Sequence, residues 1–267
     1  MGNFADFLNA SIDQQNESIQ SYEFNGRKVW LKKASERHAL WLYTPLRWFA
    51  RLLQLDALIP VPNRGGKEAI QCEYQRLTAL KKLGIKTPQV LAVSHEGILI
   101  EDAGSSEHEV VQLDHALARA ISSEQRIQLY TDAILAIQSI HAKGSYLSEA
   151  FVRNILVDED HQFTFIDFET DPGELLSLNQ CQVRDWLCFI FSSSYRLELT
   201  ELDQASAIFY HALNNNKKVY RDICNVGHKL QWILSFKPEK LGNDGKRIQK
   251  SMLFLKKLER QDPLPMI

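Results

Sequence analysis

The chain has 267 residues, of which 45% are hydrophobic and 24% are charged. These values are ordinary for folded globular proteins, and they exclude a disordered or fibrous chain. Lys and Arg number 31 against 33 Asp and Glu, which gives a net charge of −2. Because no overall positive charge is present to hold a nucleic-acid backbone, we expect no nucleic-acid partner.

The distribution of apolar residues and cysteines predicts a cytoplasmic protein. No run approaches the roughly 18 apolar residues that span a bilayer, and the first residues lack the basic and apolar segments of an export signal. The cysteines form no C-x-x-C pair, so we expect reduced thiols rather than a zinc site. They are Cys72, Cys181, Cys188 and Cys224.

The first hundred residues predict a small antiparallel sheet with one long helix. Asn25-Gly26 separates two β-prone runs, which is the strongest short signal for a hairpin because both turn residues tolerate a positive φ. Residues 67–84 place apolar side chains at helical spacing and end at Gly84. Residues 89–93 and 97–101 predict a second hairpin.

The rest of the chain predicts helices with one strand-like interruption. Helical patterns cover residues 122–144 and most of the chain from about 179 to 260. Between them, residues 154–169 contain two β-prone runs on either side of a polar turn. We therefore predict an α+β fold with an N-terminal lobe of residues 1–104, which contains the sheet, and a mainly helical C-terminal lobe of residues 105–267.

Side chains with oxygen ligands flank this later hairpin. Asn154 precedes its first run and Asp167 follows its second, so both are expected at the same end. An amide oxygen and a carboxylate suit Mg²⁺, which takes few protein ligands and completes its shell with water and phosphate. Glu149 adds a carboxylate to the preceding loop. Upstream, Lys32 ends a strand and Glu73 lies in the first long helix.

These residues together resemble the signatures of the protein-kinase-like superfamily. Val29-Trp30-Leu31-Lys32, the helical Glu73, Glu149-x-x-x-x-Asn154 and Ile166-Asp167-Phe168 are similar to V-A-I-K, the helix glutamate, H-R-D-x-x-x-x-N and D-F-G. The resemblance covers roughly residues 18–200 and implies a bilobal, protein-kinase-like fold. The pattern E-x-x-R-L-x-x-L-x-x-x-G-I-x-x-P that starts at Glu73 resembles the bacterial kinases of the lipopolysaccharide core, which act on Kdo or heptose.

The resemblance implies ATP and Mg²⁺ as cofactors and gives each residue a role in phosphoryl transfer. Lys32 would contact the nucleotide phosphates and pair with Glu73, and the backbone from Glu101 to Ala103 would bond the adenine edge. Asn154 and Asp167 would hold Mg²⁺. Glu149 would accept the proton of the acceptor hydroxyl, which we expect to belong to a sugar or a lipid-linked sugar.

Two further residues have structural roles implied by the resemblance. A buried Asp185 would tie down the loop that carries Glu149, and His141 is expected to be a core histidine rather than a base. Simpler interpretations of the site residues stay open at this stage. Glu73 could merely pair with Arg76 at i+3, and Lys33 competes with Lys32, although alternation along the strand favours Lys32.

Departures from the family pattern leave two alternatives to a sugar kinase. Leu147 and Glu149 replace the expected histidine and aspartate, and the longer glutamate arm displaces the carboxylate from its expected position. No glycine-rich phosphate loop precedes Lys32, and Glu169 replaces the glycine of D-F-G. One alternative is a pseudokinase that acts as a binding or scaffolding module, and the other is an atypical protein Ser/Thr kinase.

Residues 37–55 form an amphipathic insertion that is rich in aromatic and arginine side chains. Arg47 and Arg51 share one helical face, and an apolar stripe follows Leu46 and Phe49. One interpretation is a helix in the membrane interface, at the inner face of the cytoplasmic membrane. The other is a helix packed on the small lobe. The basic segment 245–261 has the same two interpretations, a membrane contact or a solvated terminal helix.

Overall fold

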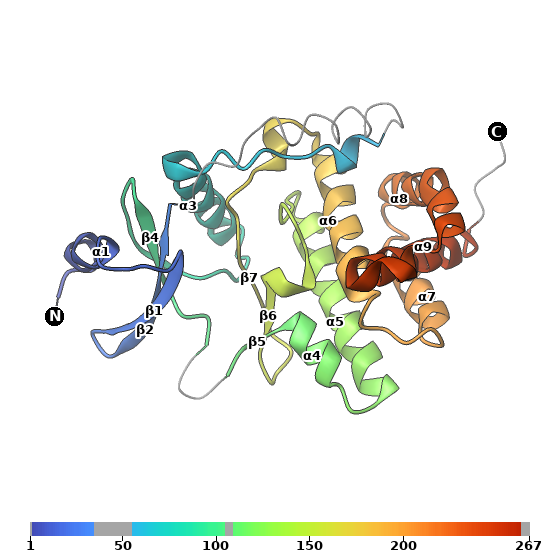
Figure 1. The fold of residues 1–267 in the computed structure, drawn as a ribbon, viewed down its shortest axis with the longest axis horizontal. Coiled ribbons are helices and arrows are strands. Elements are labelled where there is room, and N and C mark those ends of the chain that lie inside the picture. The colour runs from blue at the N-terminus through green and yellow to red at the C-terminus, as the bar shows by residue number, and fades with distance from the viewer. Residues whose placement is uncertain (1, 35–54, 105–108, 263–267) are drawn as a thin grey trace.

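A small antiparallel sheet stands at one end of the molecule and a group of helices at the other (Figure 1). The computed structural model describes residues 2–34, 55–104 and 109–262. The strands are β1 (Ile19–Phe24), β2 (Arg27–Lys33), β3 (Val90–Val93), β4 (Gly97–Glu101), β5 (Val111–Gln112), β6 (Ile155–Val157) and β7 (Phe163–Phe165). The α-helices are α1 (Phe4–Ile12), α3 (Gly66–Lys82), α4 (Leu113–Arg119), α5 (Ser123–Ala142), α6 (Leu178–Ser193), α7 (Leu202–Ala212), α8 (Lys217–Leu230) and α9 (Gly242–Glu259).

The first sheet has the strand order β1-β2-β4-β3, and its strands are antiparallel. Asn25 and Gly26 form the β1–β2 turn with φ values of 54° and 73°, which is the positive-φ pair that this turn requires. Both predicted hairpins are therefore confirmed. The predicted long helix is α3, which follows a positive-φ glycine at Gly65.

The two faces of this sheet are covered by different helices. Val29, Leu31 and Leu99 are fully buried on the face that packs against Leu8 and Ile12 of α1. The sequence-based prediction did not include α1. Because side chains alternate along a strand, Trp30 and Lys32 lie on the opposite face. The pattern of β2 therefore directs Lys32 toward α3 and the rest of the molecule.

A second, three-stranded sheet lies between the first sheet and the helices, in the order β5-β6-β7 (Figure 1). The predicted hairpin is β6–β7, in which Ile155 pairs with Phe165 and Val157 with Phe163. The two-residue strand β5 was not predicted. This hairpin carries Asn154 and Asp167 at its one end, so it positions the loop residues of the candidate site.

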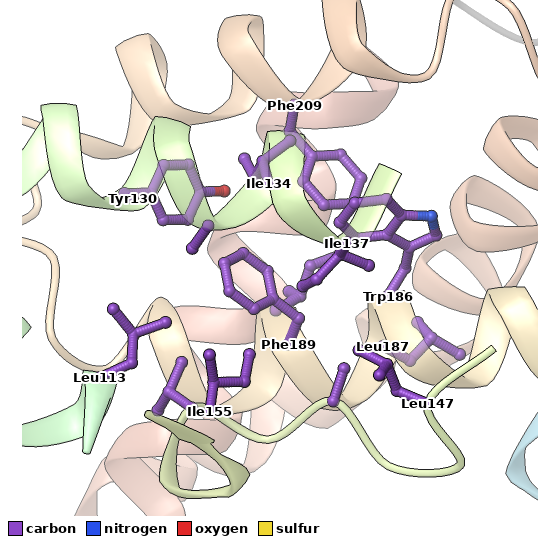
Figure 2. Packing of buried hydrophobic residues seen from close by; sticks show 14 of the residues in the cluster. Leu113, Tyr130, Ile134, Ile137, Leu147, Ile155, Trp186, Leu187, Phe189 and Phe209 are labelled. Atoms are coloured by element: carbon purple, nitrogen blue, oxygen red, sulfur yellow. The ribbon is translucent and has the colours of Figure 1, made fainter. Parts of the chain in front are cut away.

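The helices enclose a core to which α4, α5, α6, α7 and β6 contribute side chains (Figure 2). Trp186 of α6 contacts the rings of Phe189 and Phe209 with centroid distances of 6.2 Å and 5.0 Å. Tyr130 of α5 stacks on Phe189 at 5.5 Å, and burial raises the pKa of its hydroxyl well above the usual range. Each of these rings is less than 2% exposed, so they provide a rigid base beneath the β6–β7 hairpin.

The predicted α+β class is confirmed: a small antiparallel sheet is followed by a mostly helical remainder. Residues 37–54 of the predicted amphipathic insertion lie outside the described residues. Over the described ranges, no helix is long and apolar enough to cross a bilayer. All four cysteines are free, and Cys181 and Cys224 are buried.

Candidate functional site

The ammonium group of Lys32 lies among three carboxylates. Its Nζ is 3.0 Å from Glu73 Oε2, 3.0 Å from Asp167 Oδ1 and 2.9 Å from Glu169 Oε1. Glu73 lies in α3, and Asp167 and Glu169 lie in the segment that follows β7. Lys32 of β2 therefore connects the first sheet to α3 and to the end of the second sheet. The structure thus brings together Lys32, Glu73 and Asp167, which the sequence interpretation placed in one site.

Burial and charge act in opposite directions on the Lys32 side chain. Burial lowers the pKa of Lys32, but the negative charges of Glu73, Asp167 and Glu169 outweigh it, so its pKa is raised above the usual value. Burial also raises the pKa of Glu73, against the effect of Lys32. One ammonium faces three carboxylates, and the cluster as a whole favours a further positive charge.

The neighbours that competed for these roles face elsewhere. Lys33 Nζ donates to the backbone oxygen of Gln15 at 2.9 Å, on the other side of β2. Arg76 does not pair with Glu73: its Nη2 donates to the backbone oxygen of Tyr146 at 2.6 Å. Lys32 is therefore the lysine of β2 that lies beside Glu73 and Asp167, on the face that alternation along the strand indicated.

Asn154 and Asp167 flank the β6–β7 hairpin at its end. The N–H of Ile166 donates to the backbone oxygen of Asn154 at 3.0 Å, which fixes the two flanking residues beside each other. Asn154 Nδ2 donates to the backbone oxygen of Glu149 at 3.3 Å. This bond turns the amide so that its oxygen stays available.

The donor set fits a magnesium ion. Asp167 Oδ1 accepts from Lys32, whereas neither Asn154 Oδ1 nor Asp167 Oδ2 accepts a hydrogen bond from a described residue. One amide oxygen and one carboxylate oxygen match the sparse protein ligation that Mg²⁺ uses with phosphate. Within the described ranges, no three His, Cys, Asp or Glu side chains are grouped to hold a metal ion, so a cation here would need ligands from a phosphate or from water.

Two residues of this region have strained backbone conformations. Ser148 has a φ of 78° and Asp167 a φ of 70°, the left-handed region that non-glycine residues avoid at a cost of roughly 1 kcal/mol or more. Such residues concentrate at functional sites, where surrounding contacts hold them. Here the contacts are those of Lys32 with Asp167 and the burial of Ser148.

Buried contacts fix the loop between α5 and β6. Asp185 of α6, with no exposed surface, accepts from the N–H of Leu147 at 2.6 Å and lies 3.0 Å from His141 Nε2. Asp185 therefore holds this loop from α6, and the His141 side chain is only 7% exposed, as expected for a core histidine. The guanidinium of Arg76 also lies 4.1 Å from the ring centroid of Tyr146, which connects α3 to the same loop.

The carboxylate of Glu149 is not free. Its Oε1 accepts from Arg184 Nη2 at 2.7 Å, and Arg184 Nη1 contacts the backbone oxygens of Ala57 and Ile59 at 3.4 Å and 3.3 Å. Nearby negative charges, including that of Glu149, raise the pKa of the mostly buried Arg184 despite its burial. The residue predicted to be the base is thus the partner of a fixed cation.

The segment from Glu101 to Ala103 begins at the last residue of β4. The Glu101 N–H donates to the backbone oxygen of Gln89 at 2.9 Å, and the Asp102 N–H donates to that of Lys28 at 3.1 Å. The Asp102 side chain accepts from Trp30 Nε1 at 2.5 Å. No described residue bonds to the backbone of Ala103, so its N–H and carbonyl are without partners among the described residues.

Sequence reasoning missed two partners in this site. Glu169 was treated only as a departure from D-F-G, yet it binds Lys32 and accepts from Asn63 Nδ2 at 2.8 Å. Arg184 had no predicted role. Glu169 could have been found from its position two residues after Asp167, which places it near the residues that Asp167 contacts. Arg184 has no signal in the sequence beyond its position next to Asp185.

A cavity of about 390 Å³ lies away from these residues, between α4, α5 and the β6–β7 turn. Arg119, Leu129, Val157 and His161 contribute to its lining. None of the residues around Lys32 lines this cavity. The evidence for the site around Lys32 is its ion pairs and its strained backbone.

No family model matches the chain. A protein of Haemophilus influenzae that is described only as an uncharacterized protein is 22% identical to it over 228 residues, which are 84% of this chain and 84% of that protein. The similarity spans most of both chains, and the description names no activity.

Proposed function

We propose that the chain is a phosphotransferase that uses ATP and Mg²⁺, with a protein-kinase-like fold. The observation that carries this proposal is the contact of Lys32 Nζ with the carboxylates of Glu73 and Asp167, each at 3.0 Å. Phosphoryl transfer depends on positioning and on neutralising phosphate charge. A lysine held by a helix carboxylate beside two oxygen ligands provides both.

The described residues supply each part of this chemistry. Lys32 would neutralise phosphate oxygens, and Glu73 keeps its ammonium in place. Asn154 Oδ1 and Asp167 Oδ2 would hold Mg²⁺, which supplies further charge neutralisation when bound. The backbone of Ala103 would bond the base. The acceptor that we propose, a hydroxyl of a lipopolysaccharide-core sugar, rests on the sequence resemblance alone.

One observation favours a second candidate, a nucleotide-binding module with little or no turnover. Glu149 occupies the position expected for the base, and its Oε1 lies 2.7 Å from Arg184 Nη2. To accept a proton from a hydroxyl, Glu149 must share or leave this contact. If it stays bound to Arg184, the protein binds nucleotide without efficient transfer.

Nucleotide binding is tested by the melting temperature of the full chain with ATP and Mg²⁺. A ligand at a hundred times its dissociation constant stabilises the folded state by about 2.7 kcal/mol. We expect ATP and Mg²⁺ to raise the melting temperature of the wild type. We expect no such rise in Lys32→Met and Asp167→Asn. Lys33→Met is the matched control, because Lys33 is the adjacent lysine on the other face of β2.

The outcomes separate the candidates. No shift in the wild type at millimolar ATP, or an equal shift in Asp167→Asn, contradicts the nucleotide site itself. A shift without transfer to any sugar hydroxyl, measured with labelled ATP and a panel of core sugars, favours the binding module. Transfer that Glu149→Gln reduces at least about a hundredfold, with ATP binding retained, supports the phosphotransferase.

A further inference from the structure

Three large apolar side chains are exposed within ten residues of each other near the C-terminus. Trp232, Phe236 and Leu241 are 48%, 73% and 78% exposed. They belong to two short 3-10 helices, η5 (Gln231–Phe236) and η6 (Pro238–Leu241). The rings of Trp232 and Phe236 lie edge to face with centroids 5.8 Å apart. Exposed apolar side chains so close in the sequence, two of them in ring contact, are typical of a contact surface; we call residues 232–241 the η5–η6 surface.

Packing of neighbouring residues fixes the position of the η5–η6 surface. Ile233 and Leu234, on the other side of η5, pack against the core. Pro238 is buried, and its carbonyl lies so close to α9 that a Cβ on Gly245 would be 1.8 Å from the Pro238 oxygen. The exposed side chains therefore belong to a segment anchored on both sides, and their exposure is built into its backbone.

The surface is also positively charged. Residues 231–247 contain four basic side chains and two acidic ones, a net +2 in a chain of net −2. Asp244 is already paired with Arg247 at 3.1 Å. Lys237, Lys240 and Lys246 are exposed, and no carboxylate of a described residue lies within ion-pair distance of them.

We propose that the η5–η6 surface binds the surface of an anionic lipid bilayer. Aromatic and aliphatic side chains on a short, exposed segment insert at the level of the headgroups, and neighbouring lysines pair with lipid phosphates. The charge favours lipid over a second copy of the chain, because two copies would bring their lysines together. The proposal concerns residues 232–241 and depends neither on the segment 37–55 nor on nucleotide binding.

The test is co-sedimentation of the full chain with vesicles of phosphatidylcholine, with and without phosphatidylglycerol. We expect binding to the anionic vesicles that weakens at high salt. The Phe236→Ser/Leu241→Ser variant should lose at least roughly tenfold in affinity through lost apolar insertion. The Lys237→Glu/Lys240→Glu variant should lose at least roughly fivefold for each lysine.

Matched controls separate this surface from general effects of charge and exposure. Ile121→Ser removes an apolar side chain that is 94% exposed elsewhere. Lys217→Glu/Lys218→Glu makes the same charge change at the start of α8, where acidic residues are tolerated. Both controls should bind like the wild type, and unchanged circular dichroism and melting temperature should show that all variants are folded.

Several outcomes would overturn the proposal. These are a lack of wild-type binding to anionic vesicles, equal binding to both kinds of vesicle, or variants of the η5–η6 surface that bind as well as the wild type. Sedimentation velocity adds another: a wild-type dimer that Phe236→Ser/Leu241→Ser converts to a monomer, with no vesicle binding, would make a second copy the partner.

Discussion

Arg184 Nη2 donates to Glu149 Oε1 at 2.7 Å, and the same guanidinium contacts two carbonyls of the chain segment that leads into α3. The contact joins the loop before β6 to α6 and to residues 57–59. It places a fixed cation beside the carboxylate that occupies the position of the expected base.

We predict that Arg184→Met lowers the free energy of unfolding by about 1–3 kcal/mol, because Glu149 and the carbonyls of Ala57 and Ile59 lose their hydrogen-bond donor. Glu149→Gln should cost less, since that side chain is 31% exposed and water replaces its partner. Urea unfolding of both single variants and the double variant gives the coupling free energy, which we expect near 1 kcal/mol. A coupling of zero would show that the pair is not formed in solution.

The second prediction concerns pH and the buried carboxylate of Glu73. Burial raises the pKa of Glu73 above 4.5 in the folded state. A carboxyl group whose pKa is higher folded than unfolded contributes stability that is fully present below the unfolded value and is lost as the pH rises through the folded value. Glu73→Gln has no group to ionise at this position, so its free energy of unfolding should not fall in this way. The difference in free energy of unfolding, variant minus wild type, should therefore increase as the pH rises from about 4.5.

Unfolding curves at a series of pH values measure this difference. Glu96→Gln, on the exposed β3–β4 turn, is the control for removing a surface carboxylate. A difference between Glu73→Gln and wild type that is flat with pH would contradict the raised pKa of Glu73.

The third prediction concerns Glu169, which holds Lys32 Nζ at 2.9 Å. Bound phosphate and Glu169 would compete for the same ammonium. We therefore expect Glu169→Gln, which keeps an oxygen for Asn63, to bind Mg²⁺ and ATP about fivefold more tightly. Titration calorimetry measures the affinity, and Glu174→Gln, whose carboxylate pairs with Arg64, is the control. Weaker binding in Glu169→Gln would instead make Glu169 part of the cation site.

Local patterns predicted much of the fold and of the site. The Asn25-Gly26 turn, the helical period that became α3 and the alternation that directs Lys32 inward are each decided by neighbouring residues. The segment of α1 also has a signal, with Asn3 capping a helix whose Leu8 and Ile12 lie on one face. Nine residues are too few for that pattern to stand out, because packing on the sheet supplies most of its stability.

The partners of Glu149 and Glu169 could not be predicted in the same way. Glu149 binds a residue 35 positions later, and Glu169 binds Lys32 on β2 of the first sheet. Such contacts depend on how α6 and β2 are placed in space. The strand β5 is a similar case, since only its pairing with β6 makes two residues a strand.

The last prediction tests the support of the loop that carries Glu149. Asp185 is fully buried and accepts from the Leu147 N–H at 2.6 Å, a hydrogen bond that a carboxylate makes stronger than a neutral acceptor does. Asp185→Asn keeps an oxygen but loses the charge that faces His141, and we expect a loss of about 2–3 kcal/mol in the free energy of unfolding. The amide of Leu147 should exchange with deuterium faster, while amides on α9 change only with global stability. Asp222→Asn, which removes a carboxylate of α8 that accepts from Asn179, is the control. Unchanged exchange at Leu147 in Asp185→Asn would show that the loop is held by its other contacts, such as that of Arg76 with Tyr146.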